Sequence, residues 1–308
     1  MQTSRRTFLQ AAAGGLVLGQ LSDQLPAAKP KQKLTDEVGI TTGSFMRHLT
    51  VDPKPGKMRI LDLPKIMRDE LDMRVIDLMT RTLASFEPKY IDDLRNRAEK
   101  AGCIITNLKM NQKGLDLGSP DTEVKKRALD EYKRTIDVAE RLGCRWVRPI
   151  PGSKRPDLKR LADGYRELIE YAAPKKISLL IENNGWISND PNAIPAVIGL
   201  VGNRLAASPD TGNWTNAARY AGLAKAFPLA VTCDYKAFPP LGPNGEHARY
   251  DLKRCFQIGW DAGFRGPWCL EHFNDDLKAL LGGFAQLRDM LRQWTKTART
   301  PGKKSAPK

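Results

Sequence analysis

Histidine, cysteine and long apolar runs are scarce in this 308-residue sequence. Its five cysteines show no CxxC or CxxH spacing, so we expect buried thiols and no disulfide-rich fold. No run of 18 apolar residues occurs, which excludes a multi-span membrane protein. With 41% hydrophobic and 28% charged residues, the composition is that of a folded globular protein and excludes disorder throughout.

The charge is unbalanced, with 50 Lys and Arg against 35 Asp and Glu. A formal charge of +15 first suggests nucleic acid or another anionic partner. Much of the excess lies at the ends of the chain, because residues 1–33 hold five basic residues and one acid, and residues 295–308 hold five basic residues and no acid. The segment between the ends is only mildly basic, so we expect no nucleic-acid partner.

Residues 1–33 predict a signal and a linker. Ser4-Arg5-Arg6-Thr7-Phe8-Leu9 precedes the apolar run 11–19 and resembles a twin-arginine export signal. We therefore expect the twin-arginine export machinery as a partner and a periplasmic or exported location. Pro26-Ala27-Ala28 is a poor cleavage site, and an uncleaved signal would tether the protein to the membrane. Residues 295–308 predict a disordered basic tail.

Eight units of strand and helix follow one another between the ends. The strand candidates are nearly continuous apolar runs, as in parallel strands that are buried on both faces. They span residues 38–44, 74–79, 103–109, 145–150, 178–183, 206–210, 230–236 and 267–272. Helices are predicted at residues 63–71, 87–100, 120–142, 156–172, 191–201, 216–226, 251–262 and 277–294, the third capped by Ser119 with Pro120 in its first turn.

This alternation predicts an α/β fold, a single (β/α)8 TIM barrel of parallel strands over residues 34–294. A doubly wound open sheet is the alternative, but it would normally have fewer strands and a glycine-rich turn after the first. Gly43 stands alone after the first strand, so there is no dinucleotide-binding fingerprint.

Four successive strands each end in a carboxylate: Glu182, Asp210, Asp234 and Glu271. In a barrel these ends meet at the mouth, where chemistry is carried out. Buried carboxylates that converge repel one another unless a cation joins them. An all-oxygen ligand set favours a hard divalent cation, Mg²⁺ or Mn²⁺, as the cofactor.

The barrel segment resembles the xylose isomerase-like superfamily of sugar phosphate isomerases and epimerases. The resemblance covers roughly residues 35–294 and includes the runs 137–144 and 260–266. It implies that Glu182, Asp210 and Glu271 are metal ligands and that Glu182 and Glu271 exchange protons with the substrate. The seventh strand usually reads His-x-Lys, but here Asp234 stands in the His place, followed by Lys236. Lys236 would stabilise the developing oxyanion or form a salt bridge.

The candidate substrate-binding residues are Asn107, Lys109, Arg148, Asn184, Asn213 and Trp214. Epimerases of the resembled family often have histidines at the places of Asn184 and Asn213. With only His48, His247 and His272 in the chain, histidine-dependent chemistry and the zinc-rich apurinic endonucleases of the same superfamily are disfavoured. We expect His272 to point into the core.

The resemblance predicts a divalent-metal-dependent isomerase or epimerase that acts on a keto sugar or polyol by proton transfer through an enediolate. The alternatives are a metal-dependent dehydratase or lyase on a sugar or inosose, and a non-catalytic carbohydrate-binding barrel with a decayed site. The sequence leaves open which carbohydrate is bound and whether the chain forms a homo-oligomer.

Overall fold

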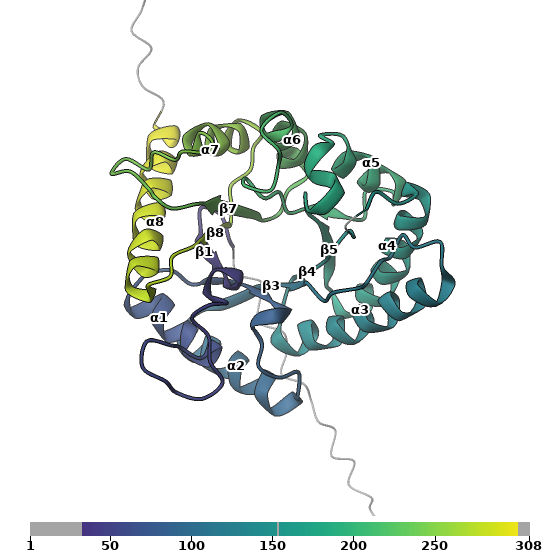
Figure 1. Ribbon diagram of the computed structural model, residues 1–308, viewed down its shortest axis with the longest axis horizontal. Coiled ribbons are helices and arrows are strands. Elements are labelled where there is room, and N and C mark those ends of the chain that lie inside the picture. The colour runs from purple at the N-terminus through teal and green to yellow at the C-terminus, as the bar shows by residue number, and fades with distance from the viewer. Residues whose placement is uncertain (1–32, 153, 301–308) are drawn as a thin grey trace, which may run out of the picture. The chain divides into compact units, whose positions relative to one another are not determined.

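The computed structural model describes residues 33–152 and 154–300, which form eight alternating strands and helices (Figure 1). The strands are β1 (Val38–Thr41), β2 (Val75–Met79), β3 (Ile104–Met110), β4 (Trp146–Pro149), β5 (Ser178–Ile181), β6 (Ala206–Ala207), β7 (Cys233–Ala237) and β8 (Trp268–His272). The helices are α1 (Leu63–Asp69), α2 (Pro88–Lys100), α3 (Thr122–Leu142), α4 (Leu158–Ala172), α5 (Ala193–Leu200), α6 (Arg219–Ala226), α7 (Leu252–Asp261) and α8 (Leu277–Arg299). None of the helices in these residues is long and apolar enough to cross a membrane. The predicted export signal lies outside the described residues.

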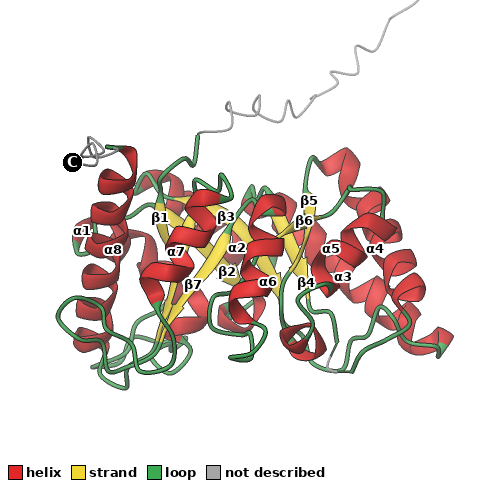
Figure 2. Ribbon diagram, turned by 90° about the horizontal axis from the view of Figure 1, so that it is seen from above, coloured by secondary structure: helices red, strands yellow, loops and turns green. Residues whose placement is uncertain are grey.

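All eight strands are parallel and hydrogen-bond in the order β6-β5-β4-β3-β2-β1-β8-β7. The first and last strands of that order meet through two isolated parallel bridges, Ala207 with Ala230 and Asp210 with Asp234. These bridges close the sheet on itself, and the helices surround it (Figures 1 and 2). The prediction of a (β/α)8 barrel is confirmed.

β5 and β6 end before the carboxylates that follow them, although the sequence predicted longer strands. Pro209 has no N–H to donate to the ladder. The side chain of Asn183 replaces the missing ladder contacts, because its Nδ2 donates to the carbonyl of Asp210 at 2.9 Å and its Oδ1 accepts the Asp210 N–H at 2.7 Å. Asp210 is therefore held at the mouth by the Asn183 side chain on one side and by its bridge to Asp234 of β7 on the other.

Aspartates cap four of the eight helices at their N-termini: Asp121, Asp157, Asp251 and Asp276. The prediction that Ser119 caps the third helix is wrong. Asp121 accepts the N–H groups of Glu123 and Val124 at 2.9 and 3.1 Å, and such bonds to a carboxylate are stronger than those to a hydroxyl. Ser119 instead accepts the N–H of Asp121 at 3.2 Å.

The last helix runs to Arg299, five residues beyond its predicted end at Trp294. The first residues assigned to the basic tail are thus helical. Arg299 forms an ion pair with Asp36, just before β1, and this contact ties the end of α8 to the start of the barrel. Residues 301–308 lie outside the described part of the chain.

All five cysteines are buried and free, as expected. Burial raises the pKa of Cys103 to about 11 and that of Cys255 to about 12. They are therefore inert thiols that pack like small apolar side chains.

Candidate active site

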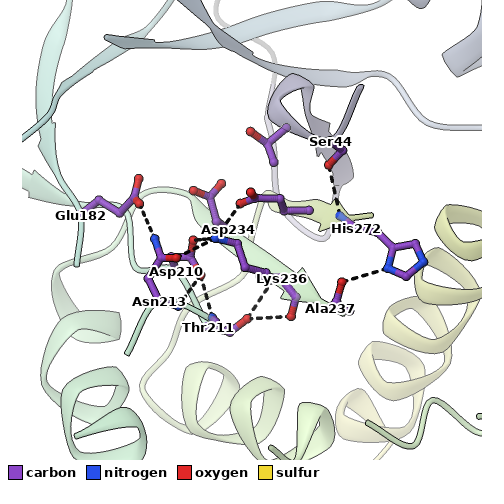
Figure 3. Close-up of polar contacts among 12 residues, drawn as sticks. Ser44, Glu182, Asp210, Thr211, Asn213, Asp234, Lys236, Ala237 and His272 are labelled. Atoms are coloured by element: carbon purple, nitrogen blue, oxygen red, sulfur yellow. Dashed lines mark hydrogen bonds and ion pairs between the residues drawn. The ribbon is translucent and has the colours of Figure 1, made fainter. Parts of the chain in front are cut away.

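Glu182, Asp210 and Asp234 converge at the mouth of the barrel, where each offers a carboxylate oxygen within 4.8 Å of the others. All three side chains are buried. Figure 3 shows them approaching from successive strands, with Asn213 and Lys236 among them. The sequence predicted that four acids from strands 5 to 8 meet at one centre, and three of the four converge here.

Asp210 is oriented by the turn that follows it. Its Oδ1 accepts the N–H of Gly212 at 2.6 Å and that of Asn213 at 3.0 Å. These bonds leave Oδ2 directed at Lys236, whose Nζ lies 2.8 Å away. The backbone thus fixes which oxygen of Asp210 faces the centre.

Lys236 reaches from β7 into this cluster. Its Nζ donates to Asn213 Oδ1 at 2.7 Å and lies 3.2 Å from Glu271 Oε2. Glu271 is therefore joined to the cluster through Lys236 and is not one of the three converging carboxylates. A role for Glu271 as a metal ligand stays a prediction.

Lys109, from β3, crosses the barrel to Asp234. It forms a buried ion pair with Asp234, donates to Thr41 Oγ1 at 2.8 Å and lies 3.7 Å from Asp77 Oδ2. Its side chain is 1% exposed. Its ammonium is thus held inside the barrel by these oxygens, and a contact of Lys109 with substrate stays a prediction.

Arg148, from β4, neutralises Glu182. Its Nε lies 2.8 Å from Glu182 Oε2, and its Nη2 donates to Asn111 at 3.1 Å. The opposite oxygen of Glu182 accepts a hydrogen bond from Asn213 Nδ2 at 2.9 Å. Both oxygens of this carboxylate are consequently held in place. The Arg148 side chain is paired with Glu182 and does not face open solvent.

Two further predicted residues take different places. Asn107 is fully buried and donates to Asp77 at 3.3 Å, which places it in the barrel interior beneath the mouth. Trp214 is 2% exposed and packs against Gly222 of α6 in the hydrophobic core. These contacts favour a core role for Trp214, and its contact with substrate stays a prediction. Asn184 lies beside Glu182 and is among the groups that lower its pKa.

The sequence analysis missed Asp77. It interrupts the apolar run of β2 and is fully buried, and its Oδ1 has no hydrogen-bond partner. A carboxylate within a buried strand was the same signal that identified the other acids. Asp77 lies in the middle of its strand rather than at the end, where barrels carry their chemistry, so the pattern of strand ends does not include it.

The acids of this site outnumber the bases by two. Burial raises the pKa of Asp77, Asp210 and Asp234, and for Asp210 it reaches about 6, with the nearby acids adding to the rise. Burial also opposes ionisation of Glu182, but Arg148, Lys109 and Lys236 outweigh it and hold the pKa below its usual value. The five acids are Asp77, Glu182, Asp210, Asp234 and Glu271, and the three bases are Lys109, Arg148 and Lys236.

This arrangement fits a divalent cation. Glu182 Oε2 and Asp210 Oδ2 have ion-pair partners but no hydrogen bond, although both are buried. Hard oxygen donors at this spacing suit Mg²⁺ or Mn²⁺. A charge of +2 would balance the excess of acids, and Glu182, Asp210 and Asp234 are the residues that would hold it.

The histidines lie outside the carboxylate cluster. His272 is 3% exposed, and its Nδ1 contacts the Ala237 carbonyl at 2.9 Å, so its ring points away from Glu271 into the core as predicted (Figure 3). His48 contacts the Asn274 carbonyl at 2.8 Å and is buried. None of the three is among the groups that could hold a metal in the described residues.

The profile of the xylose isomerase-like TIM barrel family matches residues 69–294. The chain belongs to this family. It is 25% identical over 195 residues to L-ribulose-5-phosphate 3-epimerase UlaE of Escherichia coli O157:H7 (strain EC4115 / EHEC), a match that covers 57% of this chain and 66% of the relative. The matched region thus spans just under two thirds of that relative's length.

Solved structures share the fold of this xylose isomerase-like barrel. D-psicose 3-epimerase with D-tagatose from Clostridium cellulolyticum H10 is similar at a TM-score of 0.65 and 16% identity, covering 83% of this chain and 98% of that one. A xylose isomerase-like TIM barrel protein from Mycobacterium smegmatis in complex with magnesium gives 0.61 and 19%, covering 87% and 98%. At these identities the likeness establishes the architecture alone.

Proposed function

We propose that this protein is a divalent-cation-dependent sugar isomerase or epimerase that transfers a proton at the carbon beside a ketose carbonyl. The observation that carries the proposal is the convergence of Glu182, Asp210 and Asp234 in a site with an excess of two acids. The similarity to a ribulose-5-phosphate epimerase supports the same reaction class.

Glu182 is suited to accept the proton. Its lowered pKa keeps it ionised near neutral pH, and its bonds to Arg148 and Asn213 fix its orientation. A divalent cation held by the three carboxylates would polarise the oxygens of the ketose and favour an enediolate.

Glu271 is suited to return the proton from another direction. It lies on β8, separated from β5 by β6 and β7 around the barrel, so the two glutamates approach the mouth from different sides. Epimerisation requires two such groups on opposite faces of the reacting carbon. Lys236 lies 3.2 Å from Glu271 and would donate a hydrogen bond to the developing oxyanion.

The substrate that we propose is an unphosphorylated keto sugar or polyol. Lys109, Arg148 and Lys236 are the basic side chains that contact the acidic cluster, and each is already paired with an acid. Lys109 and Arg148 are enclosed by these contacts, and Lys236, which we assign to the oxyanion, would not also hold a phosphate group. Asn184 and Asn213 provide neutral amides beside Glu182, as hydroxyl recognition requires.

Exchange of solvent deuterium tests the proposal. The protein, loaded with Mn²⁺ and incubated in D₂O with ketoses with and without a phosphate group, should introduce deuterium at the carbon beside the carbonyl, detected by NMR. Glu182→Gln and Glu271→Gln should each lower the exchange rate by about 100-fold or more, the usual contribution of a positioned acid or base. Absence of exchange in every ketose would contradict the proposal, whereas loss of water from the sugar would indicate the dehydratase.

One observation favours a second candidate, a carbohydrate-binding barrel without catalysis. Every carboxylate of the cluster already has a basic partner, so the site is held together without an added ion. Tight sugar binding that needs no divalent cation, with no deuterium exchange, would establish this alternative.

We also propose export through the twin-arginine pathway, which rests on the Ser4–Leu9 motif of the sequence. Replacement of Arg5 and Arg6 by lysine should leave the protein in the cytoplasmic fraction, while the unaltered chain is recovered from the periplasm. Equal distribution of the two proteins would count against it.

A further inference from the structure

Lys236 is surrounded by oxygen atoms in the way that a bound cation is. Its Nζ has Asn213 Oδ1 at 2.7 Å, Asp210 Oδ2 at 2.8 Å and Glu271 Oε2 at 3.2 Å. An ammonium has three N–H groups, and these three oxygens can accept all of them. They are oxygen ligands of the type that a hard divalent ion also prefers.

The position of Lys236 is built into the backbone. A methyl group at Gly212 would lie 2.6 Å from Lys236 Cδ and 2.8 Å from its Cγ, so the stem of the lysine rests directly on this glycine. The backbone of Lys236 is fixed as well, because its N–H donates to Thr211 Oγ1 at 2.9 Å and its carbonyl accepts from the Tyr250 hydroxyl. The ammonium is therefore aimed at Asp210 by packing.

Lys236 differs from the other two basic residues of the site. Lys109 and Arg148 are 1% and 2% exposed, and each is enclosed by the strands of the barrel. The side chain of Lys236 is 9% exposed and lies at the mouth, where it contacts Asp210 and Glu271. It can therefore leave Asp210 toward the mouth and still keep Glu271 and Asn213 as partners.

We propose that Lys236 is a tethered cation that competes with a divalent ion for Asp210. In the ion-free protein the ammonium neutralises Asp210 and holds Glu271 beside it, and binding of a divalent ion requires the ammonium to give up Asp210. This inference rests on the proposed function, because it concerns the same acidic cluster. It assigns to the lysine a role in setting how tightly, and how selectively, the site takes up an ion.

Binding of Mn²⁺ without substrate tests the competition directly. Isothermal titration calorimetry, with free Mn²⁺ followed by electron paramagnetic resonance, would be applied to the full chain and to Lys236→Met. The uncharged methionine should tighten Mn²⁺ binding by about tenfold or more, within the range of coupling energies between groups in contact. Lys225→Met is the matched control, since Lys225 is an exposed lysine of α6 bonded to Asn192. It makes the same change in net charge and should leave the affinity unchanged.

Gly212→Ala gives a second test in which no charge is altered. The added methyl group must displace the stem of Lys236, so Mn²⁺ binding should again tighten, by a smaller factor. Circular dichroism and thermal unfolding would establish that each variant is folded. Asp210→Asn should weaken binding in the Lys236→Met background, because it removes the ligand that the lysine occupies.

The outcomes separate this inference from the proposed function. Mn²⁺ binding by the unaltered protein that Lys236→Met leaves unchanged or weakens would overturn the competition alone. No binding by either protein would overturn the competition and the cation dependence together. No binding by the unaltered protein, with binding by Lys236→Met, would support the competition in its strongest form.

Discussion

Asp210 and Asp234 are bridge partners at the seam where the barrel closes. The Asp234 N–H donates to the Pro209 carbonyl and the Thr211 N–H donates to the Asp234 carbonyl, both at 2.9 Å. The backbone bonds that join β6 to β7 therefore also set the spacing of two carboxylates. Closing the sheet and assembling the acidic cluster are one structural event.

The ion pair between Lys109 and Asp234 predicts a strong coupling in stability. Asp234→Asn leaves a buried ammonium without its nearest charge partner and should lower the free energy of unfolding by about 3–5 kcal/mol. Lys109→Met should have a comparable effect. The double variant should lose much less than the sum, as measured by urea unfolding, because neither charge is then buried alone. If the two losses of unfolding free energy simply added in the double variant, the two charges would not stabilise each other.

A divalent ion should stabilise the fold through the carboxylate cluster. At a Mn²⁺ concentration of 100 times the dissociation constant, binding to the folded state alone adds about 2.7 kcal/mol. We expect a higher melting temperature with Mn²⁺ than after chelation, and loss of this increase in Asp210→Asn. An equal increase in that variant would place the ion elsewhere.

The contacts of the His247 ring predict that the folded protein becomes less stable at acid pH. Its Nε2 accepts the Phe238 N–H at 2.8 Å, so this nitrogen carries no proton, and Nδ1 lies 3.3 Å from the Tyr250 carbonyl. Burial, together with nearby Arg249, lowers the pKa of His247. As the pH falls below about 6.5, the unfolded chain binds a proton that the folded chain excludes, so stability decreases.

His247→Gln checks this dependence, since glutamine can accept the same N–H and does not titrate. Free energies of unfolding between pH 5 and pH 7.5 should fall less steeply for the variant than for the unaltered protein. His272, whose pKa is also lowered by burial, is present in both and cancels in the comparison. Identical slopes would mean that His247 does not contribute.

The contact between Trp214 and Gly222 predicts that this tryptophan stabilises the fold by packing in the hydrophobic core. A methyl group at Gly222 would lie 2.6 Å from the indole ring, so Gly222→Ala should destabilise the fold by about 1–3 kcal/mol through overpacking. Urea unfolding followed by tryptophan fluorescence measures this. A variant that is as stable as the unaltered chain would return Trp214 to the candidates for substrate contact.

Much of the barrel could be predicted from local pattern, because a buried parallel strand needs a continuous apolar run and a carboxylate at its end is conspicuous. Glu182, Asp210 and Asp234 were found in this way. A salt bridge of Lys236 was also anticipated, but the pairing of Lys109 with Asp234 was not, because the two residues lie 125 positions apart and meet only when the barrel closes. The side-chain direction of Trp214 depends on a loop whose path no periodicity encodes.

The ion pair between Lys109 and Asp234 joins the two halves of the chain. β3 and β7 are four strands apart in the ring, so the pair is a strut across its diameter. Two of the three bases, Lys109 and Arg148, belong to the first four strands, and four of the five acids belong to the last four. Either half on its own would be left with uncompensated charge in its interior. Separation of the chain between β4 and β5 would part Lys109 from Asp234, so we expect that neither fragment folds without the other.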